Sequence, residues 1–361
     1  MSYSYKTQQL LDKLQLEQPL IQAPMAGVSN PDLAAAVAGS GALGSLGLGA
    51  GSAALIERML DKLATRTNRP VNLNFFCHAQ PEQNPAKEAN WLARIAPLFD
   101  ALNTPVPTAM SSPYASFDDD PGTLDALLSH NASVVSFHFG LPAARPVQAL
   151  KAAGCFLLSS ATSVREAKWL AANGADAVIA QGWEAGGHRG RFLTTHNDEQ
   201  LSTLALVPRL AAAIDLPIIA AGGINNGASA HAALTLGAVA VQIGTAYVTC
   251  PESSASDAYC AALAQPEQQT LMTPVFSGRP ARGLENRVTA ALHPFSAEAP
   301  DYPVTYETGK ALANAAANTN DQQTTQDYAA MWAGQGFRGN RVMPAADLTA
   351  RISAELADLS S

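Results

Sequence analysis

The sequence predicts an α/β protein built around a (β/α)8 barrel, with a smaller helical domain near its C-terminal end. Between residues 19 and 245, short strand-forming runs alternate with helix-forming stretches rich in alanine and leucine. This alternation is typical of βα units and a parallel sheet. Two helical stretches, in "AANGADAVIA" and "LTLGAVAVQIG", end at a glycine that leads through a short turn into a buried strand. Eight strands in succession favour a closed barrel over an open, doubly wound sheet.

Each barrel unit can be placed on the chain. Apolar runs predict strands at 19–25, 41–47, 70–76, 133–140, 154–160, 175–182, 216–223 and 238–245. Stretches of helical composition between them predict helices at 30–40, 53–66, 88–103, 144–153, 163–174 and 228–237.

The alternation of strand-forming and helix-forming segments ends near Pro251. Residues 251–292 and 307–337 have the composition of helices and loops, and we expect no strands there. The last helical stretch, "PAADLTARISAEL", is expected to pack back on the barrel. The predicted domains are therefore a barrel at 1–250, a helical domain at 251–335 and a terminal helix within 336–361.

Composition and charge exclude several classes of function. The chain has 361 residues, of which 47% are hydrophobic and 14% charged, so it can bury a large core. Its net charge of −8 comes without any cluster of basic residues, so neither nucleic acid nor an anionic membrane is an expected partner. No signal-peptide pattern or bilayer-length apolar run occurs, which predicts a cytoplasmic protein. The His and Cys residues lack metal-ligand spacing, so no metal is expected.

Glycines and polar side chains gather where the predicted strands end. In a (β/α)8 barrel the carboxyl ends of the strands form the functional rim. The residues that fall there include Ala23, Pro24, Met25, Asn74, His138, Gln181, Gly186, Gly187, His188, Gly222, Gly223, Gln242, Gly244 and Thr245.

The last two strands carry a phosphate-binding pattern. Barrels often bind phosphate on backbone N–H groups of the loops after strands seven and eight, here "AAGGI" and "QIGTA". A phosphate there would place its attached group beside the "EAGGHRG" loop, with His188 above it. A plain glycine-rich turn with a solvent-facing histidine is the alternative. For His138, a core histidine bonded to the backbone is the alternative to a functional group.

Five motifs together resemble one known family. "QAPMAGVSNPDLAAAVAGSGALGSLG", "NLNFF", "AQGWEAGGHRG", "LPIIAAGGINNG" and "AVQIGTAYVTCPES" are similar to those of the nitronate monooxygenases, formerly called 2-nitropropane dioxygenases. The likeness extends through "FSGRPARG" to "MWAGQG". It implies a TIM barrel with FMN at the strand ends and a smaller helical domain over the substrate.

The resemblance also implies roles for single residues. The FMN phosphate falls on Gly223, Gly244 and Thr245, and His188 takes the position of the catalytic histidine. The flavin and its ribityl chain are expected to contact Gln242, Gln181, Asn74, Gly186 and Met25. His138 and the "DYPVTYETGK" segment resemble the bacterial class of nitronate oxidisers, which implies substrate contacts from His138, Tyr302, Tyr306, Lys310 and Tyr114. In a helix Tyr302, Tyr306 and Lys310 would share one face, although Pro303 disturbs helicity there.

The implied activity is FMN-dependent oxidation of alkyl nitronates by O₂ to a carbonyl compound plus nitrite or nitrate, a detoxification. Propionate 3-nitronate suits the single charge of Lys310, and the protein would act as a monomer or homodimer. An NAD(P)H-dependent FMN reductase acting on enoyl thioesters or quinones shares this fold and these glycine loops. A non-enzymatic FMN-binding protein and a barrel that binds phosphate without flavin also stay open.

Overall fold

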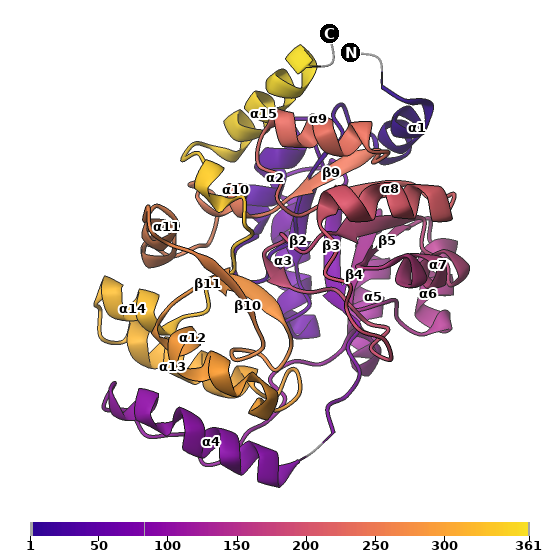
Figure 1. Ribbon diagram of the computed structural model, residues 1–361. Coiled ribbons are helices and arrows are strands. Elements are labelled where there is room, and N and C mark those ends of the chain that lie inside the picture. Colours follow the sequence, from indigo (N-terminus) through magenta and orange to yellow (C-terminus); the bar gives the residue numbers. More distant parts are fainter. Residues whose placement is uncertain (1–2, 83, 360–361) are drawn as a thin grey trace.

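The computed structural model describes residues 3–82 and 84–359, and its larger part is a closed barrel of parallel strands (Figure 1). Residues 1–2, 83 and 360–361, which include the outer ends of two predicted domains, lie outside the described residues. The strands are β1 (Leu20–Gln22), β2 (Gly44–Gly47), β3 (Val71–Phe76), β4 (Val134–His138), β5 (Phe156–Ala161), β6 (Ala177–Gln181), β8 (Ile218–Ala221) and β9 (Ala240–Ile243). They run in the spatial order β1-β9-β8-β6-β5-β4-β3-β2. A parallel bridge between Ile21 and Leu43 closes the ring, so the predicted barrel is confirmed.

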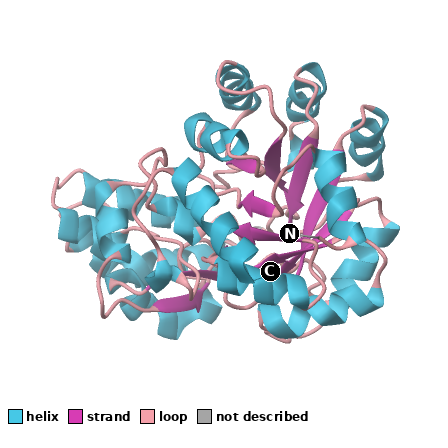
Figure 2. Cartoon of the chain, turned by 90° about the horizontal axis from the view of Figure 1, so that it is seen from above, coloured by secondary structure: helices cyan, strands magenta, loops and turns pink. Residues whose placement is uncertain are grey.

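Helices surround the barrel strands (Figure 2). They are α1 (Tyr5–Leu14), α2 (Pro31–Gly39), α3 (Ala53–Ala64), α5 (Pro121–Ser129), α6 (Ala144–Ala152), α7 (Val164–Ala172), α8 (Thr203–Ala213) and α9 (Gly227–Thr235). Several begin at a polar residue whose side chain accepts a hydrogen bond from the first turn, as Asn30 does from Leu33 and Ser163 from Glu166. Three of them, α1, α5 and α8, fall outside the predicted helices.

The barrel core has an inner and an outer part. The inner cluster includes Ile21, Leu158 and Ile219, each fully buried. Leu10 and Leu14 of α1 join it, so α1 covers the end of the barrel at which the strands begin. The outer and larger cluster fills the space between strands and helices. The carboxyl end of the barrel is thereby left as the end that can hold a ligand.

The second unit contains strands, and the prediction of none after residue 251 is wrong. Strands β10 (Thr270–Thr273) and β11 (Ala281–Leu284) form an antiparallel sheet with β7 (Gly187–His188). The helices of this unit are α11 (Asp257–Leu263), α12 (Arg287–Leu292), η2 (His293–Glu298), α13 (Tyr306–Ala317) and α14 (Gln322–Tyr328). These strands are only four residues long, and their third partner lies in a barrel loop. The local sequence therefore gives no pattern that reveals them.

One helix from the barrel half of the chain packs with this second unit. Helix α4 (Pro85–Asp100) follows β3 and lies beside α12 and α13 (Figure 1). Its Trp91 and Phe99 share a buried cluster with Phe276 and Leu312. The Trp91 indole N–H also donates to Thr308 Oγ1 at 3.3 Å. The predicted limits at residues 250 and 335 stay predictions, and α4 belongs by its packing with the second unit.

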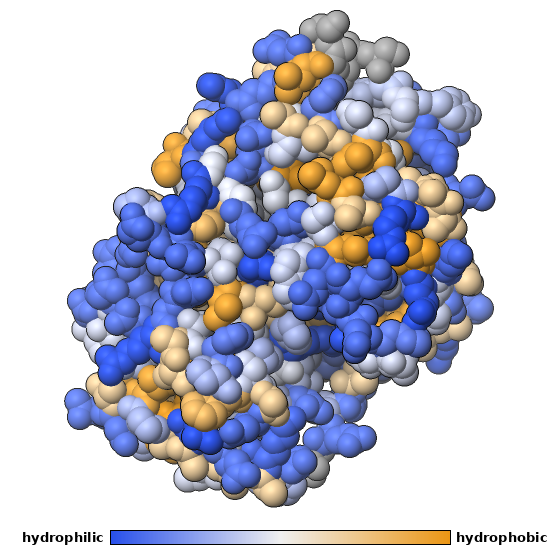
Figure 3. All heavy atoms as spheres, in the orientation of Figure 1, coloured by the Kyte–Doolittle hydropathy of each residue, from blue (hydrophilic) through white to orange (hydrophobic). Residues whose placement is uncertain are grey.

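The C-terminal segment returns to the barrel. After α10 (Thr245–Val248) and η3 (Phe337–Gly339), helix α15 (Ala345–Leu359) packs against α9 and α2. The Tyr247 hydroxyl lies 2.9 Å from Thr349 Oγ1, and Glu355 accepts a hydrogen bond from the N–H of Gly227. No helix among the described residues combines the length and apolar character needed to cross a membrane. On the face in Figure 3, hydrophilic residues dominate and apolar ones form separate patches.

Candidate active site

A cavity of about 560 Å³ lies between the carboxyl ends of the barrel strands and the second unit. Ligand cavities commonly measure about 300–1,000 Å³. Every predicted site residue except Tyr302 lines it, namely Ala23, Pro24, Met25, Asn74, Tyr114, His138, Gln181, Gly186, Gly187, His188, Gly222, Gly223, Gln242, Gly244, Thr245, Tyr306 and Lys310. Residues far apart in the sequence are thus brought to one place.

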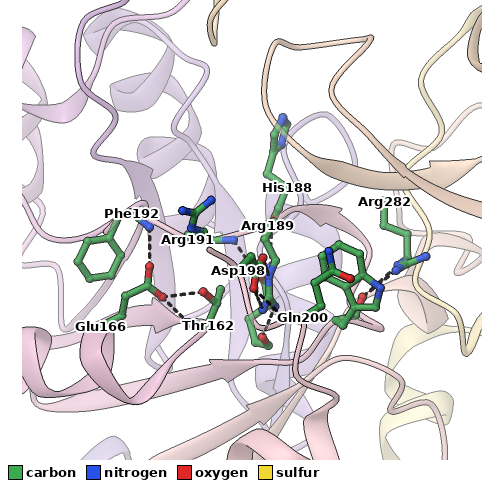
Figure 4. Close-up of polar contacts among 12 residues, drawn as sticks. Thr162, Glu166, His188, Arg189, Arg191, Phe192, Asp198, Gln200 and Arg282 are labelled. Atoms are coloured by element: carbon green, nitrogen blue, oxygen red, sulfur yellow. Dashed lines mark hydrogen bonds and ion pairs between the residues drawn. The ribbon is translucent and has the colours of Figure 1, made fainter. Parts of the chain in front are cut away.

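His188 enters this cavity from β7, within the long segment between β6 and α8. Figure 4 shows its ring extending away from the polar contacts below it. Its Nε2 atom lies 3.0 Å from Oγ of Ser277, a fully buried residue of the second unit. The catalytic candidate therefore stands where the two units meet.

Two carboxylates, the buried Glu166 and the part-buried Asp198, hold the segment that carries His188 (Figure 4). Arg189, next to the histidine, pairs with Asp198 through bonds of 2.8 and 2.9 Å and donates to the carbonyl of Gln181 at 2.6 Å. Glu166 of α7 accepts from the backbone N–H of Phe192 at 2.7 Å. A loop fixed by charge-assisted bonds of this kind holds its side chains in one place.

The glycines beside His188 have two different uses. Gly187 has a φ of +73°, and a Cβ built there would meet no atom within 4 Å, so its backbone borders open space in the cavity. At Gly186 a Cβ would lie 2.5 Å from the backbone nitrogen of Gly334. Gly186 is therefore required for backbone packing against the C-terminal segment, whereas Gly187 leaves room for a ligand.

His138 is bonded to the backbone of His188. Its Nε2 lies 3.0 Å from the carbonyl oxygen of His188, and its Nδ1 lies 3.1 Å from Ser160 Oγ. The Gln181 amide donates to the same carbonyl at 2.8 Å and accepts from the N–H of Gly190 at 2.7 Å. Both His138 and Gln181 line the cavity, but their polar atoms are engaged with the His188 segment.

Aromatic rings surround the His188 imidazole. The ring centroids of Tyr302, Tyr306 and Trp332 lie 5.3, 5.8 and 5.3 Å from it. Helix α13 begins at Tyr306, so only Tyr306 and Lys310 share a helix face toward the cavity. Tyr302 precedes the helix and is buried beside His188, and a common helical face for all three residues is not found.

Burial keeps the histidines of the site neutral. It lowers the pKa of His188 to about 3, with further lowering from the charges of His138 and Arg279. Burial likewise lowers the pKa of His138 and of His78 to about 4. By contrast Lys310 is exposed, and its ammonium lies 4.5 Å from the centre of the Tyr114 ring. At neutral pH the site thus offers an uncharged imidazole and one cation at its open side.

The other end of the cavity carries polar atoms that no described residue satisfies. Oε1 of Gln242 and Oδ1 of Asn340 are buried and have no hydrogen-bond partner within residues 3–82 and 84–359. Thr245 Oγ1 accepts from the N–H of Gly334 at 3.0 Å, which leaves its own proton for a ligand. Buried polar groups in proteins are nearly always paired. This end therefore fits a ligand that brings both donors and acceptors.

Comparison with known proteins assigns the chain to a family. A sequence profile described as nitronate monooxygenase matches residues 7–355. The chain belongs to the nitronate monooxygenase family. The resemblance inferred from its motifs is thereby confirmed, and the chain is an oxidoreductase.

Individual relatives agree with this assignment. A nitronate monooxygenase of Paraburkholderia phytofirmans is 46% identical over 349 residues, which make up 96% of this chain and 94% of that protein. A nitroalkane oxidase from Streptomyces ansochromogenes has a solved structure with a TM-score of 0.88 and 36% identity, covering 97% of this chain and 98% of that one. The enoyl reductase domain of MlnA from Bacillus amyloliquefaciens, at 13% identity and a TM-score of 0.65, shares the fold alone over 98% of this chain and 97% of its own.

The structure adds site residues to those that the family motifs predict. Ser277 and Trp332 contact His188, and Asn340 reaches the backbone of Thr245 at 2.9 Å. Ser277 lies in "FSGRPARG" and Trp332 in "MWAGQG", two of the stretches that carry the likeness to nitronate monooxygenases. These motifs mark the right segments, but their contact with His188 depends on how the second unit folds over the barrel.

Proposed function

We propose that this chain binds FMN and uses O₂ to oxidise alkyl nitronates to a carbonyl compound plus nitrite or nitrate, and so detoxifies them. The observation that carries the proposal is a single cavity with two different ends. One end holds a neutral imidazole, and the other holds glycine turns and unpartnered buried oxygens. Family membership and the likeness to a nitroalkane oxidase support the same reading.

The cofactor end fits FMN by the chemistry of its donors. Gly223, Gly244 and Thr245 hold the phosphate, with the free Thr245 proton as one donor. Oε1 of Gln242 accepts a hydrogen bond from the flavin or its ribityl chain, which removes an unpaired buried acceptor. The remaining contacts come from Ala23, Pro24, Met25, Asn74, Gln181, Gly186, Gly187 and Gly222. When bound, FMN supplies the electron acceptor and the reactivity toward O₂.

The substrate end is formed by His188, Tyr306, Lys310 and Tyr114. A neutral imidazole has one donor and one acceptor nitrogen, so the role of His188 depends on which nitrogen faces the substrate. A donor nitrogen binds the nitro oxygens of a nitronate, whereas an acceptor nitrogen takes the α-proton of a neutral nitroalkane. Lys310 adds a positive charge on the solvent side of the cavity and binds the carboxylate of a substrate such as propionate 3-nitronate. Burial under the second unit limits the access of water to the reacting atoms.

Anaerobic stopped-flow absorbance tests the proposal. The purified protein is mixed with propionate 3-nitronate in one run and with NADH in another. We expect the flavin absorbance to bleach with the nitronate and to return when air is admitted. Bleaching with NADH and none with the nitronate would overturn the proposal in favour of a reductase. The variant His188→Asn should retain the flavin spectrum, but its flavin should bleach about 10²-fold more slowly with the nitronate. This factor is the lower end of the rate effect that a positioned acid–base group contributes.

A further inference from the structure

Ser277 contacts the His188 ring from the second unit. Its Oγ atom lies 3.0 Å from Nε2 of His188 and also 3.0 Å from the carbonyl oxygen of Arg279. Ser277 itself is fully buried, so water does not compete for these bonds. The only hydrogen bond of the His188 ring within the described part of the chain is this one at Nε2, and the ring lines the cavity.

The protons in this chain of contacts can be assigned by elimination. A carbonyl oxygen only accepts, and a serine hydroxyl has one proton to donate. If that proton goes to the Arg279 carbonyl, the Ser277 oxygen must accept from Nε2–H of His188. In the reverse assignment the hydroxyl donates to Nε2 and the Arg279 carbonyl loses this donor, whereas Nδ1 faces the cavity in both assignments. The first assignment keeps the hydroxyl of Ser277 as a donor to the Arg279 carbonyl, and polar groups shielded from water are nearly always paired in native proteins.

We propose that Ser277 is a positioning residue that holds His188 in the Nε2–H form and leaves Nδ1 as the nitrogen that accepts a proton or hydrogen bond from a ligand in the cavity. The identity of that ligand rests on the proposed function, whereas the tautomer does not. Which nitrogen of a histidine carries the proton is set by the bond that its other nitrogen makes.

The main chain of His188 is held independently of its ring. Nε2 of His138 and the Gln181 amide both reach the His188 carbonyl, at 3.0 and 2.8 Å. Because a carbonyl cannot donate, His138 must also carry its proton on Nε2 and accept from Ser160 on Nδ1. Removing the Ser277 hydroxyl should therefore free the choice of tautomer without moving the backbone.

The charged and titratable groups around the His188 ring come from four segments. They are His138 of β4, His78 after β3, Arg279 before β11, and the segment around the start of α13, with Tyr302 before the helix and Tyr306 as its first residue. No carboxylate belongs to this set, so the Ser277 contact is the feature that distinguishes the two nitrogens.

Nitrogen-15 NMR of protein labelled at histidine tests the proposal directly. In the purified holoprotein at pH 7, we expect the His188 signals of a neutral ring protonated at Nε2, assigned by their loss in His188→Asn. In Ser277→Ala we expect a mixture of both tautomers. A proton on Nδ1 in the wild-type protein, or an unchanged Nε2–H form in Ser277→Ala, would overturn the proposal. If the variant fails to fold, a His188 ring protonated at Nδ1 in the wild-type spectrum still overturns the proposal.

Kinetics give a second readout. Ser277→Ala should lower kcat by about tenfold or more and leave KM and flavin content nearly unchanged, since positioned acid–base groups contribute about 10²–10⁴-fold. Ser253→Ala is the matched control, because Ser253 also donates to a backbone carbonyl, that of Val248 at 2.7 Å, but its hydroxyl forms no hydrogen bond with His188. If nitronate is not turned over and the NMR result still holds, the proposed function fails and the role of Ser277 stands.

Discussion

Nε2 of His138 lies 3.0 Å from the backbone carbonyl oxygen of His188, and this bond links barrel strand β4 to the strand that presents the catalytic candidate. The sequence predicts a substrate contact from His138, yet both of its ring nitrogens are engaged, with Ser160 and with His188. A side chain whose donor and acceptor are already used supports a neighbour more readily than it binds a ligand. The two roles have different kinetic consequences.

The variant His138→Phe separates these roles. It keeps a ring in the space beside Phe139, whose centroid lies 4.5 Å away, but removes the bond to His188. We expect kcat to fall about tenfold with little change in KM, because interactions realised only in the transition state appear in kcat. The flavin content, measured by absorbance, should remain that of the wild type. A rise in KM with kcat unchanged would instead establish His138 as a substrate contact.

The stability of the protein should fall between pH 7 and pH 5. Burial lowers the pKa of His78 and His138 to about 4 and that of His188 to about 3, whereas an unfolded histidine titrates near 6.5. Below that value the unfolded chain binds protons that the folded chain does not, so the free energy of unfolding decreases as pH falls. The expected loss at pH 5 is about 1–2 kcal/mol for each histidine.

Urea denaturation at pH 7, 6 and 5 measures this loss. His138→Phe serves as the internal comparison, because it lacks one of the three histidines. The slope of its free energy of unfolding against pH should be smaller than that of the wild type by the contribution of about one proton. A wild-type free energy of unfolding that is constant over this range would mean that the three rings bind protons in the folded state as they do in the unfolded chain.

The ion pair of Arg189 with Asp198 should contribute strongly to stability. Its side chains are 3% and 16% exposed, and Arg189 adjoins His188. Asp198→Asn leaves a buried guanidinium without its carboxylate, a change that typically costs about 3–5 kcal/mol. We expect a lower midpoint of urea denaturation and weaker flavin retention, because the segment after β6 borders the cavity.

A surface ion pair from the same region provides the control. Arg209 and Glu199 also lie 2.9 Å apart, but about half of each side chain is exposed. Glu199→Gln should change the free energy of unfolding by about 0–1 kcal/mol, as exposed pairs usually do. Equal effects of the two variants would show that burial does not distinguish these pairs.

The sequence predicts the barrel and most of the cavity because their signals are local. A strand such as β8 is a short apolar run followed at once by Gly222 and Gly223, and parallel strands bring all such ends to one rim. Seventeen of the predicted residues accordingly line one cavity. The sequence shows where each strand ends along the chain. Because the barrel is regular, these ends come together at one rim in space.

Contacts between the two units could not be predicted in this way. Ser277 lies 89 positions from His188 in the chain, and it reaches the ring because β11 pairs with β7. Helix α4 is a regular amphipathic stretch, and nothing in its own residues says that Trp91 will pack beside Thr308 rather than on the barrel. The spacing of Tyr302, Tyr306 and Lys310 would give them one face in a helix, but the helix begins only at Tyr306. Irregular tertiary packing decides each of these cases.

Lys310 offers a test of substrate choice. Its ammonium stacks over the Tyr114 ring at 4.5 Å, and it takes part in no ion pair within residues 3–82 and 84–359. Lys310→Met should raise KM for propionate 3-nitronate about five- to tenfold with kcat unchanged, the effect of losing a partly exposed charge contact of about 1 kcal/mol. The effect should shrink at high salt because exposed charges are screened.

Ethyl nitronate, which lacks the carboxylate, provides the substrate control. It should be turned over equally well by the wild-type protein and by Lys310→Met. Lys87→Met, which removes a half-buried lysine paired with Asp301 outside the cavity, is the control and should leave both KM values unchanged. An equal loss with both nitronates would mean that Lys310 acts on the reacting group itself and not on a distal carboxylate.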